Sequence, residues 1–250
     1  MIGKIISGGQ TGADRAAVDI AIAFGIDRGG WVPKGRKTEK GRLPARYKLR
    51  EMPTAEYPKR TEQNVIDSDG TLIVSHGELA GGSDFTRQMA EKHGKPWMHV
   101  DASKISLEAA VELIKAWLSG SQVKILNVAG PRASKDPKIY ETTEKLLTRL
   151  IQSLSPKSLE EAVEVLMDGM PLKDKAKIAN SEEAYLSGLH LTLGSLIRRR
   201  FGLWGENPEL MASCAKASGK ENITADEASA IIIRELWERL RKTHSLRAVE

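Results

Sequence analysis

The chain has 250 residues, of which 40% are hydrophobic and 28% are charged. These fractions are typical of a soluble globular protein, and no apolar run approaches the roughly 20 residues that a membrane span needs, so no membrane association is expected. The formal net charge is +5, and the single cysteine, Cys214, excludes an internal disulfide and a multi-cysteine zinc site.

The positive charge does not indicate a nucleic-acid-binding protein. Basic residues are interspersed with acidic ones, apart from Arg198–Arg200 and residues 34–50, and aromatic residues make up only 5% of the chain. An RNA-binding sheet or a zinc finger would need aromatic or cysteine clusters that this sequence lacks. The N-terminus also lacks the order of basic, apolar and small residues found in a signal peptide. We therefore expect a cytoplasmic location and no nucleic-acid partner.

Strand and helix patterns alternate in the first part of the chain. Short apolar runs bounded by glycine or proline predict strands, and longer stretches with helical spacing follow them. The expected strands cover residues 4–7, 28–32, 71–75, 97–100 and 124–128, and the expected helices cover residues 14–24, 58–68, 84–93, 106–118 and 137–150. This alternation predicts an α/β fold, in which a parallel sheet has helices on both faces.

The pattern changes near residues 153–157, after which no convincing strand follows. Ser158 and Glu161 have the spacing of a capping box, which predicts the start of a helix. The expected helical segments are residues 159–167, 181–200 and 225–241, with a break at 201–205. We therefore expect an α/β domain over residues 1–152 and a separate small all-α domain over residues 153–250.

The first predicted strand runs into a glycine-rich turn that leads directly into a helix. Glycines permit positive φ and close backbone approach, and a helix N-terminus offers free N–H groups and about half a positive charge, so this turn predicts an anion site. It is neither the G-x-G-x-x-G dinucleotide fingerprint nor a Walker A loop. A tight turn without a ligand is the alternative. The candidate ligand-binding residues here are Gly8, Gly9, Gln10, Thr11, Gly12 and Arg15.

Two further loops follow predicted strands at the same edge of the sheet, where open parallel sheets bind their ligands. One holds a glycine pair followed by hydroxyl side chains, for which helix capping by the first hydroxyl is the structural alternative. The other closes the last strand, and a simple turn is its alternative. The candidate residues are Gly81, Gly82, Ser83 and Thr86 in the first loop and Asn127, Gly130, Pro131 and Arg132 in the second. Together the three loops predict one shared pocket.

Weaker candidates lie in two other segments. One follows the second predicted strand, where surface solvation is the alternative for any single cation, and the other lies on one face of a predicted helix. These candidates are Lys34, Gly35, Arg36, Arg60, Thr61 and Asn64. The five histidines show no metal-ligand spacing, and no Ser/His/Asp set or pair of catalytic carboxylates is recognisable. We expect a site that binds its ligand, with no metal and no catalytic residue.

Five ordered motifs stand out in the first part of the chain: Ser7–Ala17, Gly29–Arg36, Tyr57–Asn64, Gly81-Gly82-Ser83-x-x-Thr86 and Asn127-x-x-Gly130-Pro131-Arg132. They resemble those of the molybdenum (cofactor) carrier proteins, and the resemblance covers residues 1 to about 150. That family belongs to a wider group of Rossmann-like nucleotide-binding folds, which includes the lysine decarboxylase-like phosphoribohydrolases. The resemblance implies a Rossmann-like three-layer α/β domain that binds a small phosphorylated ligand.

The resemblance also implies what that ligand is. Molybdenum cofactor is a pterin dithiolene with one phosphate, so a phosphate cradle with polar ring contacts would suit it. The alternatives are a nucleotide or an oxyanion such as phosphate, molybdate or tungstate. The implied protein is a carrier of molybdenum cofactor (molybdopterin) or a related phosphorylated pterin. Its implied partners are molybdoenzymes, and homo-oligomerisation is expected because relatives of this fold pair through their helices.

Two other functions stay open at this point. The phosphoribohydrolases carry the motif Pro-Gly-Gly-x-Gly-Thr-x-x-Glu, and here Gln88 stands where the glutamate is expected. This difference argues against hydrolysis of an N-glycosidic bond, although an enzyme of that type acting on a nucleoside monophosphate remains an alternative. The other is a nucleotide-sensing module whose helical domain contacts a protein partner.

The all-α part resembles a small helical domain of unknown function, through the motifs Leu189-His190-x-x-Leu193-Gly194-x-x-Ile197-Arg198 and Phe201-Gly202-Leu203-Trp204. This likeness implies no activity. We expect the leucine, isoleucine and tryptophan side chains named in these motifs in the core and Arg198–Arg200 on a solvated face.

Overall fold

The computed structural model describes residues 1–244. Its internal contacts divide the chain into two compact units: residues 2–153 form one, and the described residues from Leu154 onward form the other together with Met1. The expected boundary between residues 152 and 153 lies beside this division. No helix in the described part of the chain is both long enough and apolar enough to span a membrane.

The first unit is built on a five-stranded parallel sheet with the strand order β2-β1-β9-β7-β8. The strands are β1 (Lys4–Ile6), β2 (Asp27–Gly29), β7 (Gly70–Ser75), β8 (Trp97–Asp101) and β9 (Ile125–Ala129). The last strand inserts between β1 and β7, so that Asn127 pairs with Ile6 on one side and Thr71 on the other. The carboxyl ends of β1, β9 and β7 therefore lie side by side.

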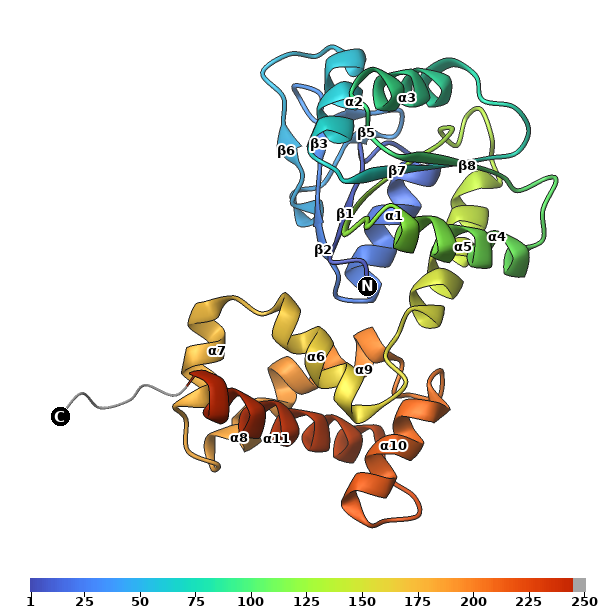
Figure 1. The fold of residues 1–250 in the computed structure, drawn as a ribbon. Helices are drawn as coiled ribbons and strands as arrows, with labels where there is room; N and C mark the ends of the chain where they lie inside the picture. Colours follow the sequence, from blue (N-terminus) through green and yellow to red (C-terminus); the bar gives the residue numbers. More distant parts are fainter. Residues whose placement is uncertain (245–250) are drawn as a thin grey trace. The chain divides into compact units, whose positions relative to one another are not determined.

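Helices cover both faces of this sheet (Figure 1). On one face, α2 (Tyr57–Ile66) packs against α3 (Gly81–Lys92). On the other, α5 (Ile139–Ser153) packs against both α1 (Ala13–Ala23) and α4 (Leu107–Gly120). Each helix buries one apolar face; α1 does so largely with alanines, which let it approach the sheet closely. The predicted three-layer α/β architecture is confirmed.

The single strand predicted over residues 28–32 is wrong in one respect, because these residues belong to two strands that lie in different sheets. Gly30 has a φ of +117°, and a Cβ at this position would overlap the carbonyl oxygen of Ser7. The chain therefore turns away from β1 after Gly29, and the N–H of Trp31 donates to Oδ1 of Asn64 at 2.7 Å instead. Only a glycine allows both the positive φ and the close approach.

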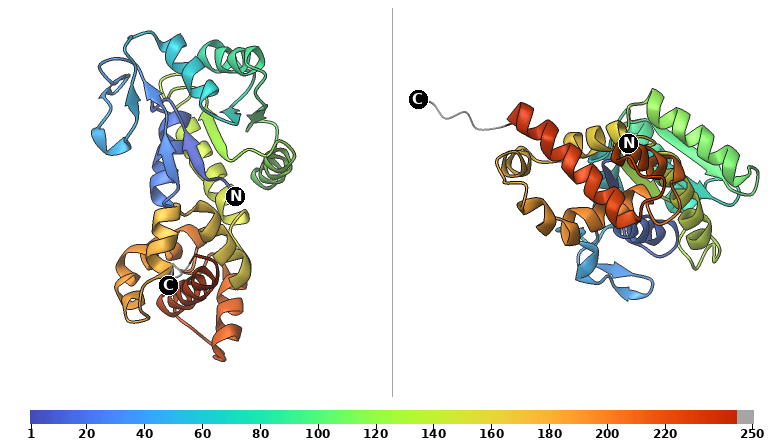
Figure 2. Two further views of the ribbon diagram at one scale, coloured as in Figure 1. Left: turned by 60° about the vertical axis from the view of Figure 1, so that its left-hand side comes forward. Right: turned by 90° about the horizontal axis from the view of Figure 1, so that it is seen from below.

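The segment after this turn forms two small sheets that stand out from the main one (Figure 2). Strand β3 (Trp31–Val32) pairs with β6 (Arg50–Glu51), and β4 (Lys37–Thr38) forms a hairpin with β5 (Gly41–Arg42). A short 3-10 helix, Ala45–Tyr47, lies between β5 and β6. Apolar side chains anchor this segment on α1; they are Val18, Val32, Leu43, Tyr47 and Leu49. None of the two-residue strands is long enough to give a periodic signal in the sequence.

The second unit is all-helical, as predicted. Its α-helices are α6 (Leu159–Gly169), α7 (Leu172–Ala179), α8 (Tyr185–Gly188), α9 (Ser195–Phe201), α10 (Pro208–Ser218) and α11 (Ala225–His244). Ser158 caps α6 by accepting a hydrogen bond from the N–H of Glu161, as its sequence predicted. The single helix expected over residues 181–200 is wrong, because α8 is followed by a π-helical turn, His190–Gly194, before α9 begins. Helices α7 and α10 were missed.

Two expectations about the core of this unit are corrected. Arg198 is 9% exposed, and its guanidinium contacts Ser229 Oγ at 2.8 Å and Asp226 Oδ1 at 2.9 Å. Burial with these partners, both near the start of α11, makes it part of the packing rather than a solvated residue. Conversely, Trp204 is 61% exposed, whereas Ile197 and Leu203 are buried as expected. The single cysteine is buried as well, and burial raises the pKa of the Cys214 thiol to about 11.

Candidate ligand-binding site

A cavity of about 880 Å³ lies at the carboxyl ends of β1, β9 and β7. The loops after all three strands line it, together with one face of α2 and the start of α3. Thirteen of the twenty predicted site residues are in this lining: Gly8, Gln10, Arg60, Thr61, Asn64, Gly81, Gly82, Ser83, Thr86, Asn127, Gly130, Pro131 and Arg132. The lining also contains residues that the sequence did not single out, among them Asp14, Tyr57, His76 and Lys135.

The N-terminus of α3 opens into this cavity without a cap. The helix begins at Gly81, three residues before the predicted start, and its N-cap Ala80 has no side chain that could accept a hydrogen bond. The first N–H groups of a helix have no partner within it, and among the described residues no acceptor reaches those of Gly81 and Gly82. Ser83, in the first turn, lines the cavity, and its hydroxyl group forms no hydrogen bond within the described chain. Free N–H groups, a hydroxyl and the helix dipole are features that favour an anion.

Packing within the protein does not require glycine at both positions of the pair at this helix start. Gly81 has a φ of +54°, which favours glycine, but a Cβ at Gly81 or Gly82 would meet no atom within 4 Å. By contrast, a Cβ at Gly130 would overlap the carbonyl oxygen of Val74, and one at Gly12 would overlap that of Pro131. Gly12 and Gly130 are thus required by packing, whereas Gly82 leaves open space toward the cavity.

Part of the opening loop's backbone is occupied by contacts within the protein. The N–H of Gln10 donates to Asp14 Oδ2 at 3.4 Å, that of Thr11 to Gln10 Oε1 at 3.0 Å, and that of Ala13 to the Pro131 carbonyl at 3.3 Å. These three amides are therefore occupied by the protein itself. The loop contributes side chains and close backbone packing to the cavity. The N–H groups of Gly8, Gly9 and Gly12 meet no acceptor among the described residues, so free amides occur here as well as at the start of α3.

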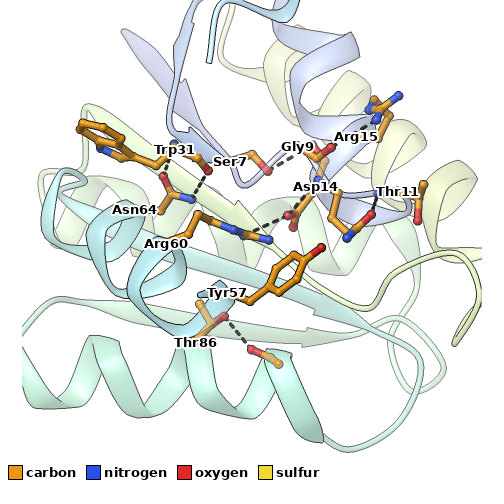
Figure 3. A network of polar contacts seen from close by, with 12 residues as sticks. Ser7, Gly9, Thr11, Asp14, Arg15, Trp31, Tyr57, Arg60, Asn64 and Thr86 are labelled. Atoms are coloured by element: carbon orange, nitrogen blue, oxygen red, sulfur yellow. Dashed lines mark hydrogen bonds and ion pairs between the residues drawn. The ribbon is translucent and has the colours of Figure 1, made fainter. Parts of the chain in front are cut away.

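A buried ion pair between Asp14 and Arg60 lies in the wall of the cavity (Figure 3). Arg60 Nη1 lies 3.4 Å from Asp14 Oδ2, and the side chains are only 11% and 8% exposed. A side chain at Gly8 would overlap the Arg60 guanidinium, so this glycine makes room for the pair. Burial raises the pKa of the Asp14 carboxyl above its usual value, and Arg60 acts in the opposite direction. Asp14 stands inside the opening motif as an acid in the first turn of α1, but that position alone is also typical of ordinary helix capping.

Glu39 links the β4–β5 hairpin to two of the cavity loops through hydrogen bonds. The sequence did not single out this residue. Its carboxylate accepts hydrogen bonds from the Thr11 hydroxyl and from both the N–H (3.1 Å) and the hydroxyl (2.6 Å) of Ser134, and it lies 3.7 Å from Arg132 Nε. The N–H of Glu39 donates to Gln10 Oε1 at 2.9 Å. Partial burial acts to raise the pKa of Glu39, but the hydrogen bonds from Ser134 and Thr11 and the nearby Arg132 hold it below its usual value.

This contact predicts an acid-sensitive component of stability. Because the folded-state pKa of Glu39 lies below the unfolded value of 4.5, its contribution is fully present above pH 4.5 and is lost as the pH falls through the lowered pKa. The variant Glu39→Gln should therefore melt at a lower temperature than the parent protein at pH 7, and the difference should shrink as the pH is lowered toward 3. Thermal unfolding followed across this range tests it; a difference that does not vary with pH would contradict the assignment.

The seven remaining predicted residues lie outside the cavity lining. The Arg36 guanidinium donates to the carbonyl oxygens of Leu43, Leu49 and Pro44, which holds the 31–51 segment together. Arg15 donates to the Gly9 carbonyl and its guanidinium lies 4.7 Å from the ring centroid of Tyr47. The other five are Gly9, Thr11, Gly12, Lys34 and Gly35. Gln88 also lies outside the lining and donates to Asp84 within α3.

The parallel sheet and the cavity at the carboxyl ends of its central strands define a Rossmann-like α/β ligand-binding domain. The profile of the circularly permutated YpsA SLOG family matches residues 5–151, and the chain belongs to this family. A second profile, that of a domain of unknown function (DUF6794), matches residues 155–240. The two matches follow the division of the structure into two units.

One solved structure is similar to the α/β unit. It is a crystal structure from Syntrophus aciditrophicus named "Putative molybdenum carrier protein". The sequences are 58% identical over 60% of this chain and 94% of that one, with a TM-score of 0.59. The two proteins are thus similar in sequence as well as in fold, and this similarity agrees with the family resemblance of the sequence motifs. No curated protein matches the chain.

Proposed function

We propose that the protein binds and carries molybdenum cofactor or a related phosphorylated pterin in the cavity at the carboxyl edge of its sheet. The observation that carries this proposal is the uncapped start of α3, where two free backbone N–H groups and the Ser83 hydroxyl meet at the wall of an 880 Å³ space. A phosphomonoester satisfies all three donors and benefits from the helix dipole. The name of the Syntrophus aciditrophicus protein supports a molybdenum-containing ligand.

The rest of the cavity suits the remainder of such a ligand. Its volume lies within the range of small-molecule and cofactor sites, and polar side chains project into it from several elements. Thirteen predicted residues form the proposed site, with the phosphate bound at Gly81, Gly82 and Ser83 and the ring system bound toward β1 and α2. Arg132 and Lys135 add positive charge at the wall formed by the loop after β9.

A ligand-dependent shift in thermal stability tests this proposal. A ligand that binds the folded protein at a concentration of 100 times its Kd stabilises it by about 2.7 kcal/mol. Purified protein should therefore melt at a higher temperature with a phosphorylated pterin than with the same pterin after phosphatase treatment. Equal melting temperatures with and without the phosphorylated compound, measured up to millimolar concentration, would contradict the proposed site.

Three related predictions concern the protein in the cell. We propose that it is cytoplasmic, that it forms homo-oligomers, and that molybdoenzymes receive its ligand. Light scattering on the purified full-length chain measures the second directly, and a monomer at micromolar concentration would refute it.

A further inference from the structure

The Asp14 carboxylate has unused capacity to accept hydrogen bonds inside the cavity. Its two contacts, from the Gln10 N–H and from Arg60, both go to Oδ2 and are both 3.4 Å long, at the weak end of hydrogen bonding. Among the described residues no donor reaches Oδ1. The side chain is nevertheless 92% buried, because its exposed fraction is 8%, so bulk water solvates it poorly. A carboxylate held in this way gains strongly from donors that a ligand would bring.

Arg60 shows the complementary property. Its Nη1 faces Asp14, but its Nε is buried and has no hydrogen-bond partner in the described chain. An arginine has five N–H donors, and in the described chain Arg60 forms one side-chain hydrogen bond, to Asp14. The ring of Tyr57, which is 44% exposed and lines the same cavity, lies 5.9 Å from the guanidinium carbon. The wall thus presents an acceptor, a donor and an aromatic face together (Figure 3).

We propose that Asp14 and Arg60 select the ring of the ligand, and that the ring is a 2-amino-4-oxopyrimidine, the unit shared by pterins and guanine. The Asp14 carboxylate accepts hydrogen bonds from the 2-amino group and the adjacent ring N–H, Arg60 donates to the neighbouring carbonyl oxygen, and Tyr57 lies against the ring face. This inference rests on the proposed function and adds the identity of the ring to it.

The number of N–H donors on the ring edge favours this ring over an adenine as the partner of the Asp14 carboxylate. A carboxylate is satisfied by two parallel N–H donors, as it is by the fork of an arginine. The 2-amino-4-oxopyrimidine edge presents two adjacent donors followed by an acceptor, which matches the carboxylate and the guanidinium in that order. An adenine presents one amino group beside an acceptor nitrogen and leaves half of the carboxylate unpaired. A buried polar group left without a partner weakens binding, and a site built on such groups discriminates strongly.

A comparison of two nucleotides isolates this interaction. GMP and IMP carry the same phosphate and the same ring carbonyl, and they differ only by the 2-amino group. Calorimetric titration of the full-length protein should give a Kd for GMP about 10- to 100-fold lower than for IMP, the range expected for one hydrogen bond to a charged group. The variant Asp14→Asn, which keeps the size of the side chain, should reduce this ratio to near 1. Inorganic phosphate should bind both proteins alike.

The outcomes separate this inference from the proposed function. If the parent protein binds GMP and IMP equally, or prefers AMP to both, the ring assignment is wrong although the phosphate site stands. If Asp14→Asn keeps the full preference for GMP, another residue reads the ring and the inference is also overturned. Because the first comparison uses the unmodified protein, it decides the matter even if the variant fails to fold. Failure of every phosphorylated compound to bind would refute the proposed function as well.

Discussion

Replacing Gly82 by valine is expected to weaken the binding of a phosphorylated pterin by at least about 10-fold while leaving the protein folded, since one hydrogen bond to a charged group is worth that much. The new side chain would occupy the open space in front of the free N–H groups of α3 and exclude the phosphate. Stability should not fall, because a Cβ here meets no protein atom within 4 Å and valine is a better helix former than glycine. Calorimetric titration together with thermal unfolding measures both properties.

The matched control is Gly120→Val at the end of α4. Gly120 is also helical, and a Cβ there also meets nothing within 4 Å, but it lies outside the cavity lining. This variant should bind the ligand as the parent protein does. If Gly82→Val bound the phosphorylated pterin with unchanged affinity, the phosphate could not lie at the start of α3.

Replacing Gly130 by alanine is expected to have the opposite effect, a large loss of stability. The new Cβ would overlap the carbonyl oxygen of Val74 on the neighbouring strand and would lie 2.6 Å from the Ala13 Cβ, so the backbone would have to move. Overpacking of this kind costs about 2–3 kcal/mol, which for a domain of this size lowers the melting temperature by about 4–12 °C. Thermal and urea-induced unfolding measure it.

The comparison with Gly82→Ala makes this test specific. One methyl group is added in both variants, at residues that line the same cavity, yet only Gly130→Ala should lower the midpoint of unfolding. A variant of Gly130 as stable as the parent protein would show that the close approach of β9, β7 and α1 is not required. The sequence alone does not show which of the two glycines is packed against a neighbouring backbone.

The large features of the fold could be predicted because they leave periodic signals. The parallel strands β7 and β9 are short, mostly apolar segments, and each is followed by a helix with a clear apolar face. The short strands around the hairpin left no such signal, since two residues cannot show alternation. Arg198 was misplaced for a related reason: three consecutive arginines resemble a solvated surface, and only the packing of α9 against α11 reveals which one is buried.

The candidate site could be predicted as a location but not as a set of contacts. Three glycine-containing loops at one sheet edge pointed to the cavity because parallel strands end on the same side. Which of these loops has free backbone N–H groups and which has N–H groups bonded within the protein could not be predicted. Several N–H groups of the opening loop donate to oxygen atoms of Gln10, Asp14 and Pro131. Two of these residues lie nearby in the sequence and the third lies far away, so the pattern could not be predicted. Glu39 reaches the site from a hairpin that the sequence did not predict.

Identification of the ligand that copurifies with the protein tests the central claim most directly. The full-length protein, isolated without added ligand under reducing, oxygen-free conditions, would be analysed by native mass spectrometry and by elemental analysis for molybdenum, tungsten and phosphorus. We expect a bound phosphorylated pterin, with phosphorus present in proportion to it, and we expect Gly82→Val but not Gly120→Val to lose it. A bound compound that lacks phosphate, or one that both variants retain equally, would contradict it.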